Sequence, residues 1–267
     1  MSENLNEILS KSIDIVKSTG IFIKNEQKKL KFENIETKNI HDFVTYVDKT
    51  AEKQLVEQFK QILPEAGFIA EEKTETRIGA VYNWIIDPLD GTTNYIHGLL
   101  PVAISVALQK NNETVLGIVY EIGLVECFYA IKGGGAFLNG SKISVSENDK
   151  VEKSLIATGF PYYDYKRLPQ FMSTLQFFMK NSHGLRRLGS AATDMAYVAC
   201  GRFEAFYEYS LSPWDVAAGA IIVEEAGGKV CDFDGRNNYL FGREIIATNA
   251  NIFEEFLHNV KNIMQEK

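Results

Sequence analysis

The sequence is poor in cysteine, and the cysteines it has are far apart. Cys127, Cys200 and Cys231 are odd in number, form no Cys-x-x-Cys pair and have no pair of histidines near them. A disulfide framework needs paired cysteines, and a zinc knot needs closely spaced ones. We therefore expect neither.

Positive charge is in deficit. The chain carries 28 Lys and Arg against 35 Asp and Glu, for a formal net charge of −7. Such a protein repels a nucleic-acid backbone or an anionic membrane surface. The 17 Phe and 12 Tyr come without interleaved basic residues, so they indicate core packing and not a nucleic-acid surface. We expect no nucleic-acid or membrane partner.

Long apolar runs are also missing. No run approaches the roughly 20 residues that cross a bilayer. The polar start from Met1 to Leu9 lacks the basic-then-apolar order of a signal peptide. These absences predict a cytoplasmic protein.

Common hydrolase motifs are absent too. There is no Gly-x-Ser-x-Gly elbow, which argues against a serine hydrolase. The histidines form no helical pair at zinc spacing, which argues against a zinc hydrolase: His41, His97, His183 and His258.

What the chain does have is the apolar content of a folded protein, with 45% hydrophobic residues in 267. Helical spacing predicts one amphipathic helix from about Glu3 that ends at Gly20, and another that follows Asp48 and stops before Pro64. The Lys-rich segment 28–38 between them is predicted to be a hairpin or a mobile loop.

Beyond Gly67 the pattern changes to short β-branched or aromatic runs. These predict strands of one large sheet, at 67–70, 81–86, 102–108, 114–120 and 125–131. The Gly133–Gly135 run and the Asn139–Gly140 pair favour a sheet corner over a phosphate loop, because no Lys-Ser/Thr follows them.

Helices and strands alternate after Lys150. We expect strands at 154–158, 203–208, 229–233 and 244–248, and helices near 169–180, 190–200, 214–226 and from 251 onward. No Pro- or Ser-rich linker divides the chain. The prediction is one unit over residues 1–267, with a soft boundary near residue 150 between halves 1–150 and 151–267.

Acidic residues gather where predicted strands and helices end. The run 81–86 leads into Asp87-Pro-Leu-Asp90, in which Pro88 prevents a helix from starting at Asp87 and favours a turn. Two carboxylates so close repel each other unless a cation lies between them, and Mg²⁺ prefers oxygen ligands. Gly91, Thr92 and Thr93 then open a short helix whose free N–H groups suit a phosphate oxygen.

Each acid also has an ordinary structural explanation. Asp90 can cap the following helix, Asp215 can be a dipole partner at the start of an apolar helix, and Glu71-Glu72 can be a solvated strand end. Their recurrence at three element ends favours a shared site, provided that the sheet order brings the ends together.

Two motifs together give a resemblance. Asp87-Pro-Leu-Asp-Gly-Thr-Thr-Asn94, with Glu71-Glu72 before it and Trp214-Asp215-Val-Ala-Ala-Gly219 after it, resembles the inositol monophosphatase family. The similarity extends from the Asp42–Asp48 segment to Gly228. It implies an α+β fold, a layered α-β-α-β-α sandwich, and a Mg²⁺-dependent phosphomonoesterase that is a homodimer and sensitive to lithium.

The resemblance also implies a metal site. Most of the residues that bind metal and phosphate then lie in the first half of the chain, 1–150. The ligands of two or three Mg²⁺ ions correspond to four carboxylates and one main-chain carbonyl: Glu71, Asp87, Asp90, Asp215 and Leu89. A phosphate monoester carries almost two negative charges, so a pocket of carboxylates would exclude it without bound cations.

By the same resemblance, Thr92 and Glu71 orient and deprotonate an attacking water, and Asp48 supports Thr92 by a hydrogen bond. A threonine hydroxyl can accept from water only if its own proton goes elsewhere, and a carboxylate receives it. Asp48 could also be the N-cap of the second helix. Lys38 either lies near the site or is an ordinary surface lysine.

Substrate contacts follow from the resemblance as well. They correspond to Asp90, Gly91, Thr92, Gly189, Ser190, Ala191, Glu208 and Asp215, with Glu208 accepting hydrogen bonds from ring hydroxyls. A helix start at Gly189-Ser190 needs no functional reason, so that assignment is the weaker one.

Three functions remain in competition. The first is a Mg²⁺-dependent phosphatase of myo-inositol 1-phosphate, with fructose-1,6-bisphosphate or another small phosphate ester as the alternative substrate. The second is a phosphatase with an aspartyl-phosphate intermediate, which needs two aspartates two residues apart, whereas Asp87 and Asp90 are three apart. The third is a regulatory binding protein that keeps the fold without catalysis.

Overall fold

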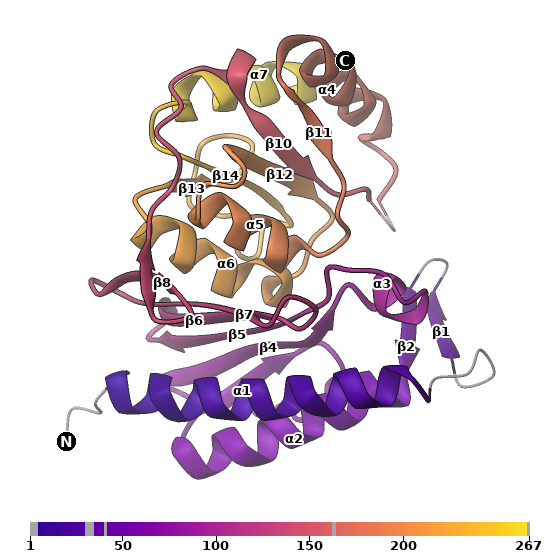
Figure 1. Ribbon diagram of the computed structural model, residues 1–267, viewed down its shortest axis with the longest axis vertical. Helices are drawn as coiled ribbons and strands as arrows, with labels where there is room; N and C mark the ends of the chain where they lie inside the picture. The colour runs from indigo at the N-terminus through magenta and orange to yellow at the C-terminus, as the bar shows by residue number, and fades with distance from the viewer. Residues whose placement is uncertain (1–4, 30–34, 40–41, 162–163, 266–267) are drawn as a thin grey trace.

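Five layers of secondary structure make up the chain (Figure 1). The computed structural model describes residues 5–29, 35–39, 42–161 and 164–265, and of 35–39 and 42–44 the backbone only. Two helices cover one face of a seven-stranded sheet, two more lie between this sheet and a five-stranded one, and two cover the far side. The predicted α-β-α-β-α sandwich of the α+β class is confirmed.

The first layer holds α1 (Leu5–Gln27) and α2 (Tyr46–Ile62). The prediction that Gly20 ends α1 is wrong, because the helix continues to Gln27. Gly20 is instead a point of close approach, where an added Cβ would lie 2.5 Å from Tyr120 Cε1. The glycine serves packing against the sheet and not termination, a difference that helical spacing does not reveal.

Helix α2 begins earlier than predicted. Thr45 is its N-cap and Asp48 is its third helical residue, so the alternative role of Asp48 as the N-cap is wrong. The two form a capping box in which the Thr45 N–H donates to Asp48 Oδ2 at 2.9 Å. The carboxylate of Asp48 is thereby fixed and 1% exposed.

The segment between α1 and α2 contains a small hairpin of β1 (Ile35–Asn39) and β2 (Asp42–Thr45). These strands were not predicted individually, although a hairpin was one of the two expectations for 28–38. The side chain of Lys38 lies outside the described residues. None of the described helices is both long and apolar enough to cross a membrane.

The seven-stranded sheet follows chain order from β3 to β9. Its members are β3 (Gly67–Ala70), β4 (Tyr82–Asp90), β5 (Ala103–Lys110), β6 (Glu113–Glu121), β7 (Glu126–Ile131), β8 (Gly135–Leu138) and β9 (Ser141–Ile143). Only the β3–β4 pair among them is parallel. The single large sheet is confirmed, and Asn139–Gly140 forms the tight turn between β8 and β9 with φ of 48° and 87°.

The five-stranded sheet has the order β11-β10-β12-β14-β13. Its strands are β10 (Leu155–Thr158), β11 (Gly184–Arg186), β12 (Ala205–Tyr209), β13 (Lys229–Cys231) and β14 (Glu244–Thr248), and β11 was not predicted. A 3₁₀ turn, η2 (Val151–Lys153), precedes β10. The outer face of this sheet is covered by α4 (Leu168–Asn181) and α7 (Phe253–Gln265), where Phe178 stacks on Phe256 with centroids 4.8 Å apart.

Helices α5 (Ala191–Ala199) and α6 (Pro213–Glu225) fill the middle layer. Eight of the thirteen α6 residues are buried, because the helix contacts sheets on both sides. One buried cluster spans both sheets and both helices, including Phe128 of β7, Met195 of α5 and Phe206 of β12. The division of the chain near residue 150 stays a prediction.

Helix α6 approaches the first sheet at a glycine. A Cβ at Gly117 of β6 would lie 2.5 Å from Ile221 Cγ2 and 2.7 Å from the Ala218 carbonyl oxygen. A backbone oxygen cannot move aside as a flexible side chain can. Gly117 therefore sets how closely α6 lies on the sheet.

We predict that Gly117→Ala lowers the free energy of unfolding by about 1–3 kcal/mol, because overpacking forces the helix away from the sheet. Urea denaturation followed by circular dichroism measures this. Glu113→Ala, at the exposed end of the same strand, is the control and should change stability by less than about 1 kcal/mol. Equal midpoints for the wild type and Gly117→Ala would contradict the packing argument.

Candidate functional site

Two acidic strand ends lie side by side. Strands β3 and β4 are parallel with Ala70 opposite Ile86, so Glu71 and Asp87 follow at matching positions. The Glu71 N–H donates to the Ile86 carbonyl at 3.2 Å. The parallel pairing explains why acids sixteen positions apart in the sequence meet at one edge.

Strand β4 does not end before Asp87 as predicted. It runs to Asp90, and its register against β5 shifts between Asp87 and Asp90, which is a β-bulge. Pro88 lies within the bulge, where its missing N–H costs no ladder bond. The Leu89 N–H donates to Asp87 Oδ1 at 2.8 Å, so the local turn holds this carboxylate.

Gly91 makes the turn from β4 into α3 (Thr92–Ile96). Its φ is +93°, and an added Cβ would lie 3.0 Å from the Pro101 oxygen and 3.2 Å from the Gly189 oxygen. Glycine is required here for both conformation and space. With five residues, α3 supplies free N–H groups but only a short dipole.

Thr92 links the loop to α2. Its hydroxyl lies 3.1 Å from Asp48 Oδ1 and 3.0 Å from the Leu89 oxygen, and both are acceptors. The hydroxyl proton is thus directed to these groups, which leaves the oxygen lone pairs free to accept. The hydrogen bond that the resemblance implied between Thr92 and Asp48 is therefore present, and the catalytic roles of both residues stay a prediction.

Asp90 reaches across to the start of α5. Its Oδ2 accepts from Ser190 Oγ at 2.7 Å and from the Ala192 N–H at 2.8 Å. Ser190 is also the N-cap of α5. The donors predicted to contact substrate around Gly189, Ser190 and Ala191 are therefore engaged, at least in part, with Asp90.

Asp215 lies in the first turn of α6. The Ser212 N–H donates to Asp215 Oδ2 at 2.7 Å in a capping box. This start of α6 is tied to the first sheet, because Ser105 Oγ of β5 donates to the Trp214 oxygen at 2.9 Å. Asp215 therefore has the structural role at the start of α6 that its sequence position indicated. The capping box also holds its carboxylate toward β4.

The carboxylates interact strongly. Burial first, then the charges of Glu71, Asp90 and Asp215, raise the pKa of Asp87 well above its ordinary value. Burial raises the pKa of Asp90 to about 6. Burial and then the charge of Asp90 raise the pKa of Asp215 to about 7. Three elements, β3 and β4 of the first sheet and α6 of the middle layer, therefore deliver negative charge to one place.

These groups do not form a finished coordination sphere. Within the described residues, no three His, Cys, Asp or Glu side chains lie close enough together to hold one ion. The donor set still fits a hard divalent cation, because it consists of oxygen ligands and because buried carboxylates that repel one another gain from a positive charge. The five metal ligands stay a prediction.

The second sheet contributes Glu208, which is 6% exposed in β12. Burial first, then Asp215, raises the pKa of Glu208, and the charge of Arg187 opposes the rise. Gly159 leaves room for this side chain, since a Cβ there would lie 2.0 Å from Glu208 Oε2. Glu208 thus faces the other predicted site residues from the opposite side.

Sequence reasoning missed Asp194 and Arg187. Asp194 in α5 is buried, and its Oδ1 has no hydrogen-bond partner. Its pKa is raised by burial and then by Glu208 and Asp90, and lowered by Arg187. An acid inside the Ala-rich run after Gly189 was the available signal for Asp194. Arg187, two residues before Gly189, resembled any loop arginine.

The model of the inositol monophosphatase family matches residues 4–265. The chain belongs to this family. The similarity that Asp87–Asn94 and Trp214–Gly219 indicated is thereby confirmed over nearly the whole length.

Relatives of the inositol monophosphatase family carry several names. A protein named Nus factor SuhB from Haemophilus influenzae is 36% identical over 96% of this chain and 97% of its own. A fructose-1,6-bisphosphatase/inositol-1-monophosphatase from Thermotoga maritima is 39% identical over 88% of this chain and 89% of its own. The solved structure of extragenic suppressor protein suhB from Bartonella henselae superposes with a TM-score of 0.90, at 34% identity and over 96% of this chain and 98% of its own.

We predict that the metal-free inositol monophosphatase-like chain loses stability as pH rises from 5 to 8. A carboxyl with a folded-state pKa above its ordinary value of 3.8 favours the fold while protonated. That contribution is lost as pH rises through about 6 for Asp90 and about 7 for Asp215. Urea unfolding in EDTA at pH 5 and pH 8 measures the loss.

Asp215→Asn should reduce this loss, because an amide does not ionise and can still accept the cap bond from Ser212. Asp14→Asn, at an exposed position of α1, is the control and should lose as much stability as the wild type. If Asp215→Asn and the wild type decline equally, the Asp215 carboxyl does not carry the effect.

Proposed function

We propose that this protein is a Mg²⁺-dependent phosphatase of small phosphate monoesters, with myo-inositol 1-phosphate as its first candidate substrate. The observation that carries the proposal is the meeting of the buried Asp87 and the half-buried Asp90, both of β4, with the half-buried Asp215 of α6, beside the Thr92–Asp48 hydrogen bond. Family membership and relatives named inositol monophosphatase support it.

The proposed metal-binding residues are Glu71, Asp87, Asp90, Asp215 and the Leu89 carbonyl. When bound, Mg²⁺ supplies the positive charge that admits a phosphate dianion and lowers the pKa of the attacking water. Metal dependence is general in the family, and the proposal adds the ion, the count of two or three, and these residues.

The chain's own groups then have distinct tasks. Thr92 accepts a hydrogen bond from the water, since its proton is directed to Asp48 and to Leu89. Glu71, at the end of β3, removes the water proton. Gly91, Thr92 and the Gly189–Ala191 segment border the phosphate, and Glu208 accepts from hydroxyls of the leaving group.

Fructose-1,6-bisphosphate is the second candidate substrate, favoured by the Thermotoga maritima relative whose name includes both activities. Several relatives named Nus factor SuhB keep a regulatory role open as the non-enzymatic alternative. By resemblance we also propose a cytoplasmic homodimer that lithium inhibits.

Phosphate release by the purified protein tests the function. The substrates are myo-inositol 1-phosphate, fructose-1,6-bisphosphate, histidinol phosphate and 3′-phosphoadenosine 5′-phosphate, each with Mg²⁺ and with EDTA. We expect release from inositol phosphate to be fastest, to need Mg²⁺ and to vanish in Asp87→Asn. Preference for another ester would change the substrate, whereas no release from any ester would favour the regulatory alternative.

We predict that Thr92→Val lowers kcat by about 100-fold or more, because it removes the group that orients the water. Thr92→Ser, which keeps the hydroxyl, should retain most of the activity. Thr93→Val removes the neighbouring hydroxyl and should leave kcat within about threefold of the wild type. Similar losses in Thr92→Val and Thr93→Val would contradict the specific role of Thr92.

A further inference from the structure

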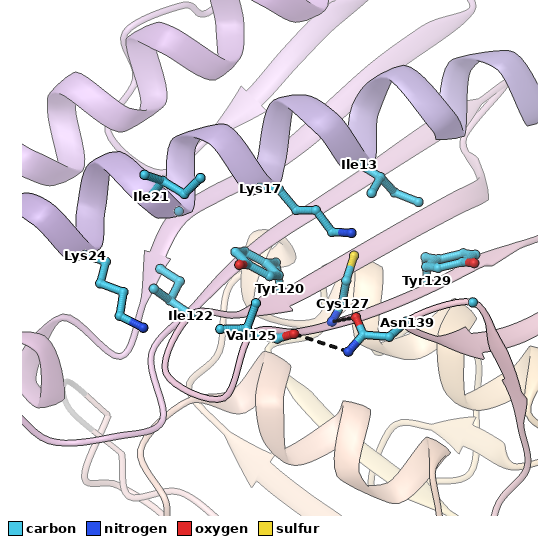
Figure 2. A pocket seen from close by; sticks show the side chains of 12 residues that line it. Ile13, Lys17, Ile21, Lys24, Tyr120, Ile122, Val125, Cys127, Tyr129 and Asn139 are labelled. Atoms are coloured by element: carbon cyan, nitrogen blue, oxygen red, sulfur yellow. Dashed lines mark hydrogen bonds between the residues drawn. The ribbon is translucent and has the colours of Figure 1, made fainter.

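A cavity of about 770 Å³ opens between α1 and the β6–β7 side of the first sheet, as Figure 2 shows. We call it the α1 groove. None of its lining residues belongs to the candidate site. Its floor is apolar and buried, with Tyr120 and Ile122 each 5% exposed and Cys127 fully buried. Its mouth is apolar and open, with Ile21 61% exposed and Val125 52% exposed.

Two cations border this apolar groove. Lys17 and Lys24 lie seven positions apart on α1, so they share one face about 10 Å apart along the axis. Figure 2 shows Lys17 reaching from the helix toward Cys127, with Lys24 on the Ile122 side.

Neither lysine is neutralised by an acidic side chain among the described residues. Across the described parts of the chain, neither makes an ion pair, and the groove lining contains no Asp or Glu. The protein as a whole is acidic, with a net charge of −7, so this is a local reversal of sign. Uncompensated cations above an apolar floor favour an anion that also carries an apolar body.

Val125 at the groove mouth is a second, independent signal. Its φ is +60°, a left-handed conformation that a β-branched residue rarely adopts and that a turn usually gives to glycine or asparagine. The Asn139 side chain holds it there, donating to the Val125 oxygen at 3.2 Å and accepting from the Cys127 N–H at 3.0 Å. Strain kept at an exposed position suggests a use for the side chain.

The groove is elongated. A second cavity of about 260 Å³ shares Lys24 and Ile122 with it and continues toward Tyr95 and Leu100. A chain-like apolar body can therefore lie along α1 with its charged end at a lysine. The volume of about 770 Å³ is also that of a small-molecule site and not of a docked domain.

We propose that the α1 groove binds a small amphipathic anion, an alkyl-chain carboxylate, with the carboxylate on Lys17 or Lys24 and the chain over Tyr120, Ile122 and Val125. A neutral chain would leave the lysines without a partner. A cationic amphiphile would be repelled by them. The site is separate from the phosphatase site and does not depend on that assignment.

Isothermal titration of the full-length protein with decanoate tests this, with EDTA present so that no metal ion binds the probe. We expect one decanoate per chain and much weaker binding of decylammonium, which has the same chain and the opposite charge. Lys17→Gln combined with Lys24→Gln should weaken decanoate binding at least about tenfold.

Two further variants locate the site. Lys11→Gln combined with Lys53→Gln removes the same charge from exposed positions outside the groove and should leave the affinity unchanged. Val125→Gly should weaken binding several-fold while thermal stability stays equal or rises, because the strain at φ +60° is released.

Three results would overturn the proposal. They are no saturable decanoate binding, equal binding of decanoate and decylammonium, and unchanged affinity in the Lys17 and Lys24 double variant. The last of these would place the amphiphile on other exposed apolar residues, such as Leu99 and Leu124.

Discussion

The crowding of several carboxylates at one place is the constraint on which the site depends. Asp87 is buried, Asp90 and Asp215 are half-buried, and the charges of Asp90 and Asp215 raise the free energy of ionising Asp87. An arrangement like this persists only if the fold holds each group by other means. Here the means are backbone N–H groups, from Leu89 in the bulge, Ala192 at the start of α5 and Ser212 at the start of α6.

The layered architecture follows from the need to bring those N–H groups together. Helix starts from the middle layer must point at the bulge of β4, so α6 has to lie close against the first sheet. Gly117 of β6 permits this approach. Gly219 of α6 permits the close approach of α5, since a Cβ there would lie 2.7 Å from Met195 Cβ. Close packing at these two glycines therefore helps to position Asp215.

Much of this was predictable from sequence, and the exceptions have physical reasons. Asp87, Asp90 and Asp215 could be found because acids recur at three element ends and because they stand in two motifs that resemble the inositol monophosphatase family. The bulge could not, since Pro88 signals a turn in most contexts and only pairing with β5 keeps it in the strand. The role of Gly20 was also hidden, because close approach to Tyr120 is a long-range contact. Arg187 and Asp194 matter through their charge in a shared buried space, which no local pattern records.

Helix α3 connects the candidate site to α1, the helix that lines the α1 groove. The Tyr95 hydroxyl donates to the Ile23 oxygen of α1 at 2.8 Å, and Gln27 Nε2 of α1 donates to the Tyr95 oxygen at 3.1 Å. Tyr95 belongs to α3, the helix that Thr92 begins. Contiguity supplies a route between the sites but no coupling free energy, which arises only if a ligand in the groove prefers one arrangement of α1 over another. These two hydrogen bonds join the end of α1 to α3, and a ligand in the groove can reach Thr92 by this route only if the two arrangements of α1 differ in these bonds.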